Sequence, residues 1–134
     1  IIAEIGVDMS KWQSAKHLSA WLNLTPNTKI TGGKIISSKM MKKDNRAGQS
    51  LRQAASSLSN DKSAIGDAHR AIRTRLGGKG AVIATAHKLA RIIYTMLLKK
   101  NEYNKDIINK NQENLKEQKI KKLENLLDRL KKAA

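Results

Sequence analysis

Apolar residues recur at three- and four-residue spacing along much of the chain, which is the spacing of one buried face of an α-helix. A first helix follows Ser14, whose hydroxyl suits an N-cap. A second runs from about Asn45 to Leu58, and a third lies between a cap at Ser59 or Asn60 and the Gly77-Gly78 pair. The positions expected to be buried are Ala15, Leu18, Trp21 and Leu22, then Leu51, Ala54, Ala55 and Leu58, then Ile65, Ala68, Ile72 and Leu76.

Residues 81–98 form the most apolar segment, and their apolar side chains cover more than half of the helix circumference. This pattern predicts a helix in the centre of the core. The first five residues are apolar apart from Glu4 and meet Gly6, as at the C-terminal end of a helix. We therefore interpret the chain as a piece cut from a longer protein.

Residues 26–44 lack a sustained period and predict a loop, with at most a short extended piece at Ile35-Ile36. After Asn101 the composition changes to Asn, Lys and Glu with about one Leu or Ile per turn. Heptad spacing is confined to Ile120, Leu123, Leu127 and Leu130. The prediction is a mostly α protein without useful β-strands: a compact helical domain over residues 1–104 with a long basic loop, and a basic amphipathic helical tail over residues 105–134.

The net charge of the 134-residue chain is +16, with 27 Lys and Arg against 11 Asp and Glu. Such an excess attracts polyanions, so nucleic acid is the leading partner and a membrane surface is its rival. His87, Lys88 and Arg91 interrupt the apolar run, which argues against a membrane-spanning helix. Cysteine is absent, and two Trp and two Tyr are too few for a base-stacking platform, so phosphate contact is the expected mode.

Acidic residues and histidines do not indicate a metal site in this chain. No pair of carboxylates lies in a segment suited to a two-metal nuclease site. His17, His69 and His87 lie on different predicted helices and are expected to be surface or core residues. We therefore expect no metal-binding residues here.

The segment Lys29–Arg52 carries seven Lys or Arg against one Asp. Thr31-Gly32-Gly33-Lys34 predicts a turn whose backbone N–H groups can approach a phosphate, although this stretch taken alone favours a plain β-turn on a basic surface. Further phosphate contacts are expected from Lys39, Lys42, Lys43, Arg46 and Arg52, which lead into a helix start with free N–H donors. His87 and Arg91 lie at i and i+4 on the core helix, either as a second phosphate contact or as cover for apolar surface.

Three quoted stretches, "SAKHLSAWLNLTP", "ITGGKIISSKMMKKDNRAGQSLRQAASSL" and "KGAVIATAHKLARIIYTML", occur in this order. Together they resemble the C-terminal transposase domain of the DEDD insertion-sequence transposases of the IS116/IS110/IS902 type, which include the bridge-RNA-guided recombinases. The resemblance covers nearly all of residues 1–104. It implies an N-terminal RuvC-like domain, absent here, whose four acidic residues bind Mg²⁺.

The resemblance also implies a nucleophilic serine in a Ser-Gly-Gly turn that forms a covalent phosphoserine intermediate. That position is Thr31 here, which keeps the hydroxyl but adds a methyl group that crowds an in-line attack. Ser37 or Ser38 is the alternative nucleophile. The implied partners are DNA, a guide RNA and further copies of the full-length protein, in the bacterial cytoplasm at the nucleoid and without a membrane.

Three functions remain open from the sequence. The first is the DNA-binding and strand-transfer domain of an insertion-sequence transposase, acting through a hydroxyl nucleophile. The second is a non-catalytic basic module that binds nucleic acid, and the third is a protein-interaction element acting through the heptad tail. Phosphate neutralisation has the same sequence pattern in the first two.

Overall fold

The computed structural model describes residues 1–133, and in residues 105–133 it describes the side chains only in part. The described residues are mostly α-helical, which confirms the predicted fold class. They divide into two compact units, Ile1–Tyr103 and Asn104–Ala134. The first unit contains α1 (Ile2–Ile5), η1 (Met9–Lys11), α2 (Ala15–Trp21), β1 (Lys29–Thr31), β2 (Lys34–Ser37), α3 (Arg46–Ser57), η2 (Leu58–Asn60) and α4 (Ala64–Lys99), and the second contains α5 (Lys105–Ala133).

The core of the first unit lies between α2, α3 and α4. Its largest fully buried apolar side chains are Leu18, Leu22, Leu24 and Leu51. Small residues at the contacts allow the helices to approach closely. A Cβ atom at Gly48 would lie 2.0 Å from the carbonyl oxygen of Leu22, so only glycine fits where α3 crosses the end of α2.

The buried face of α3 differs from the predicted one. It consists of Ala47, Gly48, Leu51 and Ala55, whereas Ala54 is exposed and Leu58 is half-buried. The helix was predicted to start at about Asn45, but the predicted buried stripe began at Leu51 and omitted Ala47 and Gly48. Asn45 caps the helix by accepting a hydrogen bond from Gly48 N–H at 2.8 Å. Ser14 caps α2 as predicted, with its hydroxyl accepting from His17 N–H at 3.4 Å.

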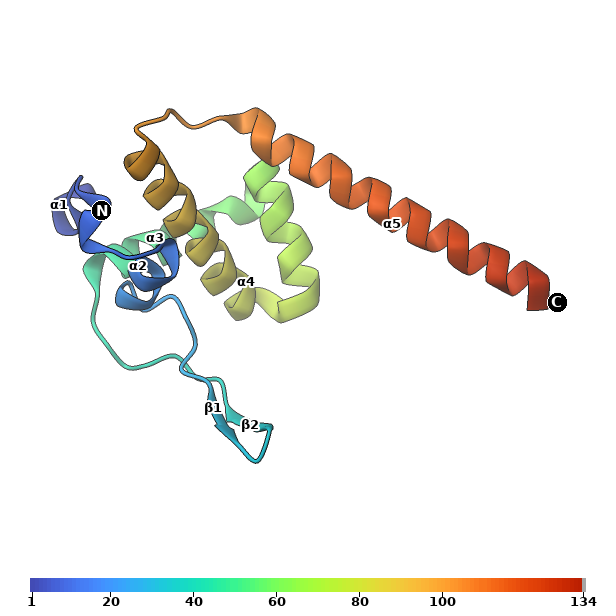
Figure 1. The fold of residues 1–134 in the computed structure, drawn as a ribbon, viewed down its shortest axis with the longest axis horizontal. Helices are drawn as coiled ribbons and strands as arrows, with labels where there is room; N and C mark the ends of the chain where they lie inside the picture. Colours follow the sequence, from blue (N-terminus) through green and yellow to red (C-terminus); the bar gives the residue numbers. More distant parts are fainter. Residues whose placement is uncertain (134) are drawn as a thin grey trace. The chain divides into compact units, whose positions relative to one another are not determined.

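Helix α4 consists of two legs that reverse direction at Gly77, where φ is 73° (Figure 1). The predicted stop at the Gly77-Gly78 pair is therefore a sharp kink. The legs are joined by the buried His69, whose Nδ1 lies 2.8 Å from Thr85 Oγ1. On the other side of the ring, Nε2 lies 3.3 Å from Ser59 Oγ. Because both ring nitrogens have partners, His69 is a core residue, as the sequence indicated.

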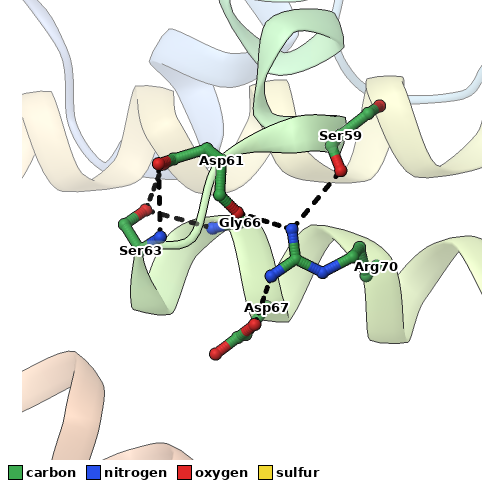
Figure 2. A network of polar contacts seen from close by, with 6 residues as sticks. All are labelled: Ser59, Asp61, Ser63, Gly66, Asp67 and Arg70. Atoms are coloured by element: carbon green, nitrogen blue, oxygen red, sulfur yellow. Dashed lines mark hydrogen bonds and ion pairs between the residues drawn. The ribbon is translucent and has the colours of Figure 1, made fainter.

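The first leg of α4 begins at Ser63, not at the predicted cap Ser59 or Asn60. Ser63 Oγ accepts from Gly66 N–H at 3.3 Å and donates to the Asp61 carboxylate. Figure 2 shows how the Arg70 guanidinium closes this connection by donating to the Ser59 and Asp61 carbonyl oxygens and pairing with Asp67. The buried positions of this leg are Gly66 and His69, whereas Leu76 is exposed, because the leg ends at the kink beyond the core.

The predicted loop over residues 26–44 contains a β-hairpin, which corrects the expectation of no strands. Strands β1 and β2 are antiparallel, with Ile30 opposite Ile35 and Thr31 opposite Lys34. Gly32 and Gly33 connect them with φ of 55° and 75°, the two positive values of a two-residue hairpin turn. Since Lys29 pairs with Ser37, Ile36 is the extra residue of a β-bulge.

One described helix, α4, is long and apolar enough by length and composition to cross a membrane. Core helices pass the same test, and α4 buries Ala86, Ala90 and Tyr94 in the core beside α2 and α3. The Tyr94 hydroxyl also donates to the Trp12 carbonyl oxygen at 3.1 Å. These contacts bury part of the apolar surface of α4 in the core.

The second unit is the single helix α5, which carries the predicted heptad positions. Where the structure describes its side chains, they are exposed, including Ile120, Leu123, Leu127 and Leu130. The prediction that this tail packs on the domain or on a partner stays a prediction.

Candidate nucleic-acid interface

The β-hairpin presents a hydroxyl between two ammonium groups. Successive side chains of a strand point to opposite faces, so Lys29 and Thr31 share a face, and Lys34 joins them as the cross-strand partner of Thr31. All three residues are exposed. Among the described elements the two strands contact only each other, and Figure 1 shows the hairpin projecting from the helices. Thr31 is therefore open to a large ligand.

The base of the hairpin is held through its backbone. Asn27 N–H donates to the Lys39 carbonyl oxygen at 3.0 Å. The side chain of Asn23 donates to the carbonyl oxygens of Met41 at 2.8 Å and Lys43 at 3.2 Å. Because these contacts use backbone oxygens, the side chains of Lys39, Lys42 and Lys43 remain exposed. The connection thus holds a basic segment in place without neutralising its charge.

The N-terminus of α3 does not offer the free N–H donors that the sequence suggested. Ala47 N–H donates to Glu4 Oε2 at 2.7 Å, and Gly48 N–H donates to Asn45. Arg46 Nε lies 3.6 Å from Glu4 Oε1, although its side chain is 91% exposed. The Glu4 carboxylate of α1 therefore lies where we expected a phosphate to bind, and it also pairs with Arg46.

Arg52 has a structural contact. Its Nη1 donates to the Asn23 carbonyl oxygen at 3.3 Å, and the residue is half-buried. Asn23 itself has a left-handed conformation with φ of 54°, and its side chain holds the basic segment. Arg52 thus supports the loop that carries the lysines.

His87 and Arg91 lie on the second leg of α4, which the hairpin strands do not contact. Arg91 is exposed and His87 is half-buried. Burial lowers the pKa of His87 below its ordinary 6.5, and the neighbouring Arg91 charge lowers it further. His87 is therefore mainly neutral at pH 7, and the structure does not bring this pair together with the hairpin.

A comparison with protein families gives this geometry a context. The sequence model of the transposase IS116/IS110/IS902 family matches residues 1–70. The chain belongs to this transposase family. The matched part contains the hairpin, α3 and, between them, the exposed Lys39, Lys42 and Lys43, which we name the lysine segment. The role is that of an insertion-sequence transposase, and its substrate is DNA. Searches of curated proteins and of solved structures found no match.

A second basic cluster of the transposase was missed in the sequence. Arg73, Arg75 and Lys79 surround the Gly77 kink of α4, and all three are exposed. The signal was the stretch "RTRLGGKG", which repeats the combination of basic residues and a Gly-Gly pair found at Thr31–Lys34.

The donor set of the described transposase residues does not fit a metal ion, because no three His, Cys, Asp or Glu side chains come together in that part of the chain. Residues 26–43 contain no acidic residue and no histidine. The segment therefore supplies neither a carboxylate nor an imidazole beside Thr31. Of the alternative nucleophiles, Ser38 is exposed and Ser37 is half-buried.

Proposed function

We propose that the hairpin and the lysine segment of this transposase bind the DNA sugar-phosphate backbone, and that Thr31 is the nucleophile for a DNA phosphate. The observation that supports this most is the exposed Thr31 hydroxyl between Lys29 and Lys34 at a two-residue turn. The ammonium groups would stabilise the charge that develops on the phosphate oxygens. Lys39, Lys42 and Lys43 would hold the neighbouring phosphates.

The proposed step forms an ester between Thr31 Oγ1 and phosphorus. The hydroxyl loses its proton to a base outside residues 26–43, and the bond from phosphorus to the leaving sugar oxygen breaks. That oxygen then takes a proton, so a new 3′ or 5′ hydroxyl end appears on the DNA. The ester between Thr31 and phosphorus conserves the free energy of the cleaved phosphodiester bond. The DNA strand can therefore be joined to another DNA end.

Other partners of the proposed reaction follow from the family resemblance. Mg²⁺ is proposed to bind in a RuvC-like domain, because the described residues do not supply its ligands. A guide RNA and further protein copies are proposed partners, and the site of action is proposed to be the bacterial nucleoid.

A non-catalytic binding module is the second candidate. It is favoured by the β-branched side chain of Thr31 and by the lack of an acidic or histidine side chain within residues 26–43. In that case the lysines bind DNA in the same way, but Thr31 forms no covalent bond.

The deciding experiment looks for a covalent protein–DNA adduct that survives denaturation. Labelled DNA is incubated with Mg²⁺, guide RNA and the transposase, either unchanged or as Thr31→Ser or Thr31→Val. Thr31→Ser should raise the yield, because it removes the crowding methyl group, and Thr31→Val should abolish the adduct. Matched Ser37→Ala and Ser38→Ala variants should keep it. An adduct that survives Thr31→Val would assign the nucleophile elsewhere, and no adduct with Thr31→Ser would favour the binding module.

A further inference from the structure

The face of the hairpin opposite Thr31 is apolar and open. Ile30 and Ile35 are cross-strand partners, and their exposed fractions are 62% and 66%. Ile36, the extra residue of the bulge, is 68% exposed. The cross-strand pair Ile30–Ile35 at this exposure forms a small apolar patch on this face, and clustered exposed apolar side chains are typical of interaction sites.

The described part of the chain does not cover this patch, since β1 and β2 contact only each other. Isoleucine favours strands, but serine or threonine at these positions would also keep a two-stranded ribbon that faces water on both sides. The folding of the hairpin therefore does not require three exposed isoleucines. Their presence indicates a ligand with apolar surface.

We propose that the Ile30–Ile35 face is a wedge that contacts DNA bases at an unstacked or unpaired step. This inference rests on the proposed function, because it uses the same hairpin and the same DNA. The positive charges of Lys29 and Lys34 favour a polyanionic ligand. In DNA, the bases supply the apolar surface that the isoleucines can contact. Isoleucine is among the side chains that proteins insert between base steps.

Because the hairpin has one basic and one apolar face, the DNA base step that it contacts must be distorted. Thr31 and Lys34 face one way and Ile30 and Ile35 the other, so the ribbon contacts a phosphate and bases on opposite sides. In an intact duplex, stacked bases expose only their edges in the grooves. A ribbon between a backbone and displaced bases satisfies both faces, and it would hold the phosphate beside the Thr31 hydroxyl.

A second copy of the hairpin fits this patch less well than DNA does. Pairing two Ile30–Ile35 faces would join two hairpins that each carry Lys29, Lys34 and Lys39, and no acidic residue in residues 26–43 offsets this like charge. The charge of the hairpin instead complements a polyanion. We therefore commit to DNA as the occupant.

The test compares two duplexes labelled with 2-aminopurine, one fully paired and one with a two-base mismatch. The unchanged transposase should bind the mismatched duplex about tenfold more tightly, and the fluorescence should rise on binding as the label unstacks. The variant Ile30→Thr with Ile35→Thr keeps two β-branched residues and should fold. It should lose the preference and the fluorescence rise, but keep salt-dependent binding to paired DNA.

Val7→Ser is the matched control, because it removes an apolar side chain that is 69% exposed outside the hairpin. It should keep both the preference and the fluorescence rise. The wedge is refuted if the double variant behaves like this control, or if it changes only the oligomeric state in sedimentation. Failure of the proposed function looks different, because paired DNA would then show no salt-dependent binding that Lys34→Ala weakens.

Discussion

Glu4 Oε2 accepts a hydrogen bond from Ala47 N–H at 2.7 Å, which joins α1 to the first turn of α3 across 43 positions of the sequence. The carboxylate lies at the positive end of the helix dipole and also 3.6 Å from Arg46 Nε. Under the proposed function it would therefore compete with DNA phosphates for the same donors. The first turn of α3 is internally neutralised, whereas the lysines before it are not.

Glu4→Gln should weaken the fold and strengthen DNA binding. The amide oxygen can still accept from Ala47, but the negative charge beside Arg46 and the helix dipole is lost. We expect the free energy of unfolding to fall by about 0.5 kcal/mol. DNA binding at low salt should tighten by about threefold, as Arg46 becomes free for phosphate. Urea unfolding and fluorescence anisotropy measure the two effects, and weaker DNA binding would contradict the proposed competition.

Lys42→Ala should reduce the number of phosphate contacts by one. Its side chain is exposed, so stability should change little. The slope of log K against log salt should fall in magnitude by about 0.9. Lys62→Ala removes the same charge at an exposed position outside the proposed surface, and it should change the slope less. Equal slopes for the two variants would show that only net charge matters.

Gly48→Ala should destabilise the first unit by about 2 kcal/mol or more, since the new Cβ would lie 2.0 Å from a backbone oxygen of Leu22. Gly78→Ala is the matched control. Its Cβ would meet nothing within 4 Å, and it lies in the second leg of α4, so it should be neutral or stabilising. Thermal unfolding followed by circular dichroism distinguishes them. Similar melting temperatures for both variants would contradict the close approach of α2 and α3.

The lowered pKa of His87 predicts a loss of stability in mild acid. The folded protein binds this proton less readily than the unfolded chain, whose histidine titrates near 6.5. The stabilising contribution is therefore complete above pH 6.5 and is lost as the pH falls through the folded-state pKa. His87→Gln should flatten the dependence of the unfolding free energy on pH in this range. An unchanged pH profile would mean that burial does not disfavour the charged imidazole.

Local signals in the sequence were sufficient to predict most helices of the first unit. Ser14 and Asn45 are side-chain caps that act within three residues, so the starts of α2 and α3 followed directly from sequence. The Gly77 kink likewise follows from glycine's access to positive φ. These features depend on neighbours in the chain and little on the rest of the fold.

The hairpin and the Glu4 contact were missed for two different reasons. The strands are three and four residues long, and the unpaired Ile36 directly follows Ile35 in the sequence, which hides the alternation of a strand. The Glu4–Ala47 contact depends on how α1 packs against α3, which no local pattern encodes. The same holds for Arg52, whose role depends on the position of the Asn23 carbonyl.

Among the described elements the hairpin strands contact only each other, so the requirements for DNA contact at the hairpin are separate from the requirements for packing of the helices. If the hairpin binds DNA as proposed, substitutions at its tip would alter DNA preference without disturbing the leucines that hold α2, α3 and α4 together. A mobile element that meets new insertion sites could therefore diversify at residues 29–37 while its folding stability stays constant.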